Sequence, residues 1–270
     1  MSRFIILMCL MFFSLASVMA QCNIQNTVFQ SGERLMYHAS YNWGFIWLDA
    51  GIAEFVVSER SVNNVNMYHF NSTGRSYPEY DWFFMVRDTF QSTADVTSLQ
   101  SATYRRRTNE GAYSVWNDYR FDKDQQLIYT RSGNTEKSTV RDTFPNEECY
   151  YDLLTAIYFF RNLSFDTMKL GEEVKMKMIV DNELFPDLYA RYLGIDTLTM
   201  RNGKQYRCHV LKPMLVEGTM FKGGEHMKVW VSADRNRVPL MIEAELLIGS
   251  VKAYLVSYSG LRHAFESGVD

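Results

Sequence analysis

The sequence contains little proline and cysteine and has no marked excess of charge of either sign. Its 270 residues include 5 prolines, 15 glycines and 4 cysteines, which excludes collagen-like and linker-like compositions. A formal net charge of −3 provides no electrostatic basis for binding nucleic acid. Apolar residues make up 47 % of the chain and aromatic residues 15 %. We therefore expect a globular protein with a sizeable core.

Motifs of catalysis and metal binding are also absent. The chain has no HExxH, Cys-x-x-Cys or Asp-rich calcium loop, and no G-x-S-x-G element for a nucleophilic serine. Metal sites commonly draw histidines from short, regular spacings. No two histidines here lie within five residues of each other: His38, His69, His209, His226 and His263. We accordingly expect no metal site and no cofactor, and a binding role rather than catalysis.

The N-terminal twenty residues have the pattern of a secretory signal peptide. Arg3 precedes an apolar run from Phe4 to Phe13, and Val18-Met19-Ala20 resembles a cleavage site. We predict that residues 1–20 are removed and that residues 21–270 form one domain in the periplasm. No later stretch reaches about 18 apolar residues, so no transmembrane helix is expected in the mature chain. A lipid anchor on Cys22 is an alternative, although Gln21 stands where a lipobox has Gly or Ala.

Cleavage would leave three cysteines, which cannot all form pairs with one another. Cys208 alternates with Tyr206 and Val210, a pattern that favours a buried thiol. The sequence leaves open whether any two of Cys22, Cys149 and Cys208 form a disulfide.

Most of the chain has the alternation of a β-strand. Val174, Met176, Met178 and Val180 point one way while the intervening residues are mostly charged, and similar runs occur at 53–58, 113–122 and 227–232. Turn-forming pairs separate the runs, and Asn202-Gly203 is typical of a hairpin. We predict a mainly β protein whose curved antiparallel sheets form an open barrel or a sandwich.

One central segment departs from the strand pattern. Residues 146–163 carry apolar side chains at helical spacing and on nearly every side. Pro145 followed by two glutamates suits the first turn of a helix. We therefore predict one buried helix at about 146–163, covering or plugging the curved sheet.

Two polar constellations could bind or react with a ligand. Arg105 and Arg107 share one face of a strand and could bind an anionic group through their guanidinium groups. The alternative is that they are solvent-exposed charges on an edge strand, where they discourage pairing with another chain. Glu243 and Glu245 lie about 6–7 Å apart by strand rise. That separation suits a glycosidase-like carboxylate pair, but two charges on a wet strand face are more common.

Aromatic residues are concentrated near residue 80. The stretch Tyr77 to Phe84 contains five rings in eight residues. Such rings can stack on sugars or line an apolar ligand cavity. They also fill ordinary β cores, which is the simpler interpretation for most of them.

Several local patterns recur along the mature chain in a fixed order: GERLMYHASYNWG (Gly32 to Gly44), DAGIAEF (Asp49 to Phe55), NEGAY (Asn109 to Tyr113), YRFD (Tyr119 to Asp122), YDLLTAIYFFRNL (Tyr151 to Leu163), VWVSADRNRVPLMIE (Val229 to Glu243) and IGSVKAYLVSYSGL (Ile248 to Leu261). Together they resemble the DUF3108 family of exported bacterial proteins in its Bacteroidetes form. The family has no established reaction. The resemblance implies a fold similar to β-rich envelope lipoproteins of capsule assembly, with a curved open barrel and a periplasmic or outer-membrane-associated location.

Within that resemblance, polar residues embedded in strands become candidate ligand contacts. Asn109, Glu110 and Tyr113 stand where a sheet edge meets a turn, and Trp230 precedes the turn at Asp234 to Arg237. The function we expect is non-catalytic binding of an envelope component, namely a lipid, a glycan or a partner protein. The alternatives are an enzyme acting on envelope glycans through Glu243 and Glu245, and a structural scaffold of the envelope.

Overall fold

The structure is a computed structural model, and it describes residues 24–43, 46–62, 64–217, 222–246 and 249–269. The expected signal peptide and Cys22 lie outside the described residues. No helix in these ranges has the length and apolarity needed to span a bilayer.

The described strands form one antiparallel sheet. Along the sheet the order is β8-β7-β6-β5-β4-β3-β2-β1-β14-β13-β12-β11-β10-β9, with short β15 added beside β11. The first arm comprises β1 (Arg34–Trp43), β2 (Ile46–Val62), β3 (Val65–Ser76), β4 (Val86–Asp95), β5 (Ser101–Glu110), β6 (Tyr113–Asp122), β7 (Leu127–Asn134) and β8 (Val140–Pro145). The second arm comprises β9 (Glu173–Val180), β10 (Glu183–Thr199), β11 (Gln205–Pro213), β12 (Met227–Ser232), β13 (Pro239–Glu245), β14 (Ser250–Ser259) and β15 (Gly268–Val269).

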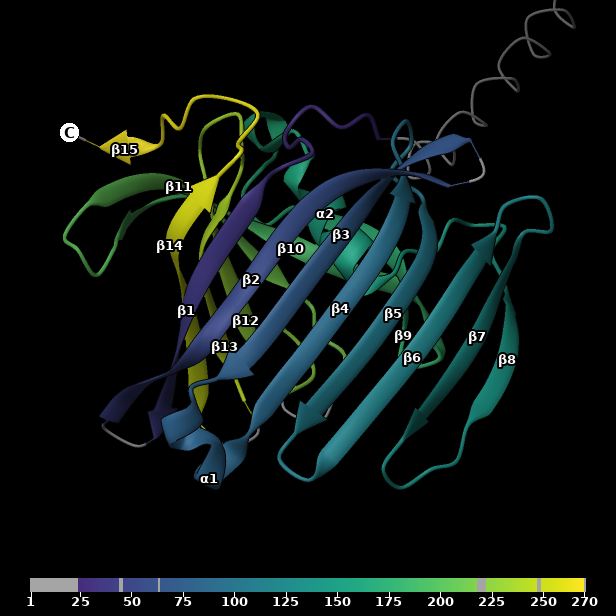
Figure 1. Cartoon of the computed structure of the whole chain (residues 1–270). Helices are drawn as coiled ribbons and strands as arrows, with labels where there is room; N and C mark the ends of the chain where they lie inside the picture. The colour runs from purple at the N-terminus through teal and green to yellow at the C-terminus, as the bar shows by residue number, and fades with distance from the viewer. Residues whose placement is uncertain (1–23, 44–45, 63, 218–221, 247–248, 270) are drawn as a thin grey trace, which may run out of the picture.

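The fold class is confirmed, since the protein is mainly β and its curved sheet does not close into a barrel. The sheet curls around α2 (Leu153–Arg161), which packs against β3, β4 and β9 (Figure 1). Short helical turns complete the chain: η2 (Pro78–Tyr80), α1 (Asp81–Phe84) and η3 (Phe165–Thr167). Period-two alternation produces the strands: Ala53, Phe55 and Val57 share the inner face of β2, as predicted.

The central helix is shorter than the predicted 146–163. It begins after Asp152, whose side chain accepts hydrogen bonds from the backbone N–H groups of Leu154 and Thr155. Pro145 belongs to the end of β8 and not to the helix. The segment between them is held by β9, because Tyr151 donates to the Lys177 carbonyl at 2.9 Å and accepts from the Ile179 N–H at 3.0 Å. A strand-like contact therefore replaces the predicted first helical turns.

The hairpin turns also differ from expectation in one respect. The predicted hairpin connects β10 to β11, but of its two central residues only Gly203 has a positive φ, at 79°. Two consecutive left-handed residues occur instead at Asp181 and Asn182, with φ of 46° and 68°, in the turn between β9 and β10. This turn has the φ signs of a tight type I′ hairpin.

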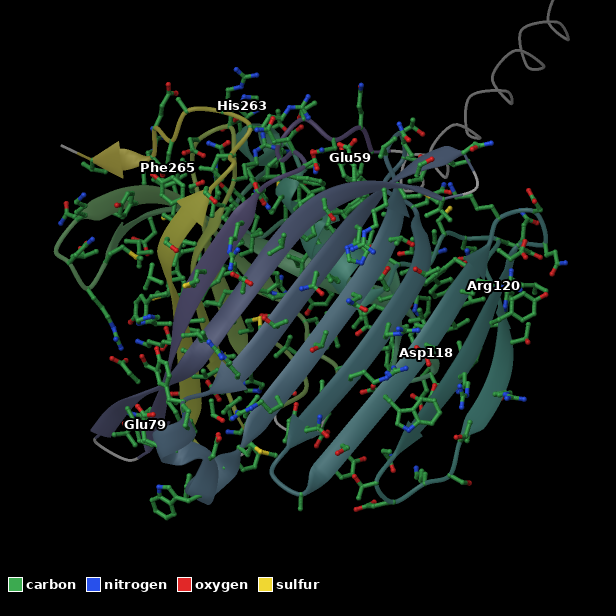
Figure 2. The ribbon with its side chains drawn as sticks, in the orientation of Figure 1. Glu59, Glu79, Asp118, Arg120, His263 and Phe265 are labelled. Atoms are coloured by element: carbon green, nitrogen blue, oxygen red, sulfur yellow. The ribbon has the colours of Figure 1, made fainter. Side chains whose placement is uncertain are left out.

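Because neighbouring strands are antiparallel, their connections alternate between two ends of the sheet. The α1 end carries the connections β1–β2, β3–β4, β5–β6, β7–β8, β9–β10, β11–β12 and β13–β14. The α2 end carries the connections β2–β3, β4–β5, β6–β7, β10–β11 and β12–β13. Glu59 and Glu79 mark the α2 end and the α1 end respectively in Figure 2.

The thiol of Cys208 is free and buried, as predicted. Burial raises its pKa to about 12. Cys149 is disulfide-bonded.

Candidate functional site

The two predicted arginines lie together on the outer face of β5 and share one carboxylate. Arg107 donates from Nη2 to both oxygens of Asp118 at 2.8 Å, and Arg105 donates from Nε to Oδ1 at 3.0 Å. Asp118 lies opposite them on β6, where Figure 2 labels it. Both side chains remain partly exposed, at 59 % and 41 %. The structure therefore brings the pair together, but with a carboxylate of the chain itself between the guanidinium groups.

The predicted residues of the β5–β6 hairpin divide between the two faces of the sheet. Asn109 lies on the outer face, where its side chain accepts from the Ser114 hydroxyl at 2.7 Å and donates to the Arg87 carbonyl. Glu110 and Tyr113 pair directly across the two strands, so they share the inner face. The structure thus brings Glu110 and Tyr113 together on the inner face and places Asn109 on the opposite, outer face.

The remaining predicted residues lie on the second arm. Trp230 is buried in the core and donates from its indole nitrogen to Asp196 at 3.2 Å. Glu243 pairs with Lys252 at 3.1 Å, and Glu245 pairs with His226 at 3.1 Å. Lys222 also lies 3.6 Å from Glu245, so the two glutamates have different partners.

Inside the curl, the inner face changes character from one end to the other. Near α2 the inward residues are fully covered, as for Phe70, Ser92 and Tyr104. Toward the α1 end the inward residues Ser72, Ser76 and Thr108 are also buried. Nine others on these strands are only partly covered: Ala53, Phe55, Gly74, Asp88, Phe90, Arg106, Glu110, Tyr113 and Val115. Since α2 packs against only part of the concave face, these nine residues keep some exposed surface. We call these nine residues the open inner face.

Arg106 is the central polar group of the open inner face. Its Nη1 donates to Asp181 at 2.7 Å, and its guanidinium lies over the Phe90 ring at 5.9 Å from the ring centre. Its Nε is buried and has no hydrogen-bond partner among the described residues. A buried donor without an acceptor is uncommon in folded proteins.

Asp88 lies on the same face of β4 as Phe90. Burial raises its pKa to about 7, and the nearby Glu110 carboxylate adds to this effect. The backbone N–H of Asn109, which donates to Asp88 at 3.2 Å, and the charge of Arg106 act in the opposite direction. Near neutral pH the Asp88 carboxyl therefore exchanges between a form that donates a hydrogen bond and one that only accepts.

The turn between β9 and β10 inserts against the inner face of the first arm. Asp181 accepts from Arg106 and from Asn117, the latter at 3.1 Å. The Asn182 N–H donates to the Tyr119 hydroxyl at 2.9 Å, and the Asn182 side chain bonds to Ser132 and Asp142. These contacts tie the two arms together beside the open inner face, and they position Arg106.

A second, smaller feature lies at the α2 end. A polar cavity of about 250 Å³ is lined by Asp166, His209, Ala233, Asp234, Arg235, Arg237 and Glu266. His209 is held by the Tyr192 hydroxyl at 2.9 Å, and burial lowers its pKa. Most other polar groups here support the β12–β13 turn: Asp234 accepts from Ser232, Asn236 and Glu266, and Arg237 donates to the Leu163 carbonyl. The predicted turn at Asp234 to Arg237 thus connects β12 to β13 and is hydrogen-bonded to the segment after α2.

Within the described ranges, no three potential ligands from His, Cys, Asp and Glu gather in a way that could hold a metal ion. Sequence reasoning did not identify Asp88, Arg106 or Asp181 as site residues. One signal was available for Asp88: it alternates with Phe90, Ser92 and Ala94, so an acidic residue shares the inward face of a strand with apolar and small residues. The partner of Arg106 lies 75 residues away and has no local signal.

Comparison with known proteins agrees with this architecture. A family model described as "Protein of unknown function (DUF3108)" matches residues 36–256. The structure is similar to the crystal structure of a β-barrel-like protein of domain of unknown function DUF1849 from Brucella abortus, with a TM-score of 0.52 and 9 % sequence identity. That similarity covers 87 % of this chain and 100 % of the other, and at this identity it shows the fold alone. No curated protein matches the sequence.

Proposed function

Since this chain belongs to the DUF3108 family of proteins of unknown function, we propose its role from its own geometry: it is an exported, non-catalytic protein that binds an amphipathic component of the bacterial cell envelope on the open inner face. The observation that carries the proposal is the gradient of coverage along the first arm. Beside α2 the inward residues of these strands are covered, whereas toward the other end Phe55, Phe90 and Val115 are only partly covered.

The side chains of this face suit a ligand with an apolar body and a polar head. Phe55 and Phe90 offer apolar surface, which favours contact with hydrocarbon. The guanidinium of Arg106, whose side chain is 15 % exposed, offers positive charge to the head group. Of the three envelope components considered, a lipid fits this combination best.

Export to the periplasm is supported by the sequence pattern of residues 1–20. The disulfide at Cys149 agrees with it, because disulfides persist mainly in oxidising compartments.

The test is native mass spectrometry of the protein purified from the periplasm of its own host. We expect a co-purifying mass that fragments as a lipid. The variant Phe90→Ser should lose most of it, whereas Tyr129→Ser, on the outer face of β7, should retain it. Circular dichroism would confirm that both variants fold. The absence of any bound mass, or equal retention by both variants, would contradict the proposal, and a bound glycan or protein would redirect it to those classes.

A further inference from the structure

The α1 end of the sheet carries an unusual exposed apolar segment. Trp82, Phe83, Phe84 and Met85 are consecutive, and their exposed fractions are 83 %, 54 %, 41 % and 36 %. Exposed apolar residues are ordinary when they are scattered singly. Four in succession are unusual, and the Trp82 and Phe83 rings are in contact, with 5.9 Å between their centroids. We call these four residues the α1 patch.

Hydrogen bonds to the neighbouring strands support the turn that carries the α1 patch. Arg87 clamps Asp81 through two hydrogen bonds, at 3.1 and 2.6 Å, and Ser76 also donates to Asp81 at 2.5 Å. The chain entering the turn is fixed to the neighbouring strand, because the Tyr77 N–H donates to the Ala50 carbonyl at 2.9 Å. The side chains are therefore exposed by a well-supported turn between β3 and β4.

One further connection at the α1 end exposes an apolar side chain. The β11–β12 connection begins with Met214, which is 38 % exposed.

Charged turns occur at both ends of the sheet. The α2 end has Asp122-Lys123-Asp124 and Arg201-Asn202-Gly203-Lys204, and the α1 end has Thr135-Glu136-Lys137 in the β7–β8 connection. The α1 patch is therefore a local feature of the β3–β4 turn. Figure 1 shows α1 at this end of the sheet, below the ends of β3 and β4.

We propose that the α1 patch inserts into the surface of a lipid bilayer, so that the protein docks on a membrane by its α1 end. A turn with exposed Trp and Phe side chains suits the boundary between head groups and acyl chains, where amphipathic aromatic side chains are enriched. The only charges within the turn are acidic, Glu79 and Asp81, and Asp81 is already paired with Arg87. Docking therefore depends on apolar insertion and not on attraction to anionic lipid.

Membrane docking through the α1 patch does not require a ligand on the open inner face. The open inner face lies toward the same end of the sheet, so a docked molecule would have that face close to the membrane.

The test is flotation of the purified protein with vesicles of three parts phosphatidylethanolamine to one part phosphatidylglycerol. We expect the protein to float with the vesicles and to remain bound in half-molar sodium chloride. The double variant Trp82→Ser/Phe83→Ser should lose about tenfold or more in partitioning, given the apolar area removed. The matched control is Val62→Ser/Val65→Ser, which removes side chains of 45 % and 48 % exposure at the α2 end and should bind like the unaltered protein.

Vesicles with brominated acyl chains supply a second measurement that does not depend on how well a variant folds. They should quench part of the tryptophan emission of the unaltered protein, and Trp82→Phe should lose that part while it still floats. Failure of the unaltered protein to float, loss of binding in salt, or equal binding by the two double variants would overturn the proposal. A patch that instead mediates self-association in vesicle-free solution would also overturn it. Native mass spectrometry tests the bound ligand separately, so the two proposals can fail independently.

Discussion

Arg161 and Glu33 form a two-pronged ion pair in the interior of the protein. The guanidinium donates to the two carboxylate oxygens at 2.6 and 2.9 Å, and the side chains are 3 % and 0 % exposed. Arg161 also donates to the backbone carbonyls of Asn236 and Arg237. A single side chain thus joins the end of α2 to the segment before β1 and to the β12–β13 turn.

Removal of Arg161 should therefore be strongly destabilising. In Arg161→Met the Glu33 carboxylate would be left buried without a counter-charge, which typically costs about 3–5 kcal/mol. The measurement is the free energy of unfolding from urea titration. The control is Arg34→Met, because Arg34 forms an exposed pair with Glu54 and should contribute no more than about 1 kcal/mol. Equal effects of the two substitutions would show that the buried pair has no special role.

The stability of the protein should depend on the protonation of Asp88. In the unfolded chain this carboxyl loses its proton near pH 3.8, whereas in the fold it keeps the proton up to about pH 7. Between these values the unfolded state binds fewer protons, so the contribution of Asp88 to stability falls as the pH rises. It is constant below this window and again above it.

The variant Asp88→Asn should lack this loss. Relative to the variant, the unaltered protein should lose on the order of 2 kcal/mol between about pH 4 and pH 8, after allowance for partial exposure. Urea titrations of both proteins across that range measure the difference. A difference that does not change with pH would contradict the raised pKa.

The thiol of Cys208 should be unreactive in the folded protein. Burial raises its pKa to about 12, so almost none of it is the reactive thiolate at neutral pH. Ellman's reagent should therefore label it only after denaturation. Cys208→Ser identifies its share of the signal, since the folded traces of the two proteins should coincide and the denatured traces should differ by one thiol. A difference between the folded traces would mean that the strand opens.

The two glutamates once considered as a catalytic pair should be dispensable for folding. Both lie on β13 and are partly exposed, at 37 % and 55 % of their side-chain surface, beside different partner side chains. Glu243→Gln and Glu245→Gln should each change the free energy of unfolding by less than about 1 kcal/mol. Growth of the host under envelope stress should likewise be unaffected. A marked growth defect in a variant of normal stability would revive a chemical role for the pair.

Local patterning explains why much of the fold could be predicted. Alternation identified the inner residues of β2 and the strand β9, since it needs no knowledge of distant partners. The start of α2 was misplaced because Pro145 and the acidic residues after it are helix-start signals, while the true cap, Asp152, is chosen by tertiary contacts with Ser92 and Ser101.

The candidate site was less predictable, for a physical reason. Alternation correctly put Arg105 and Arg107 on one face, but their shared partner Asp118 follows only from the register of β5 against β6. The role of Arg106 depends on Asp181, which the second arm supplies. Residues whose environment is set by contacts between the arms have no signature in their own segment.

The strand order also determines how the chain must fold. Apart from β15, every pairing between strands of the described sheet joins strands that follow one another in sequence, except the pairing of β1 with β14. Each arm can therefore assemble by short loop closures, which cost little entropy and are fast. Union of β1 with β14 closes a loop of about two hundred residues and is slow by comparison. Until it occurs, both strands have an unpaired edge, so a chain that is still folding is exposed to aggregation at this junction.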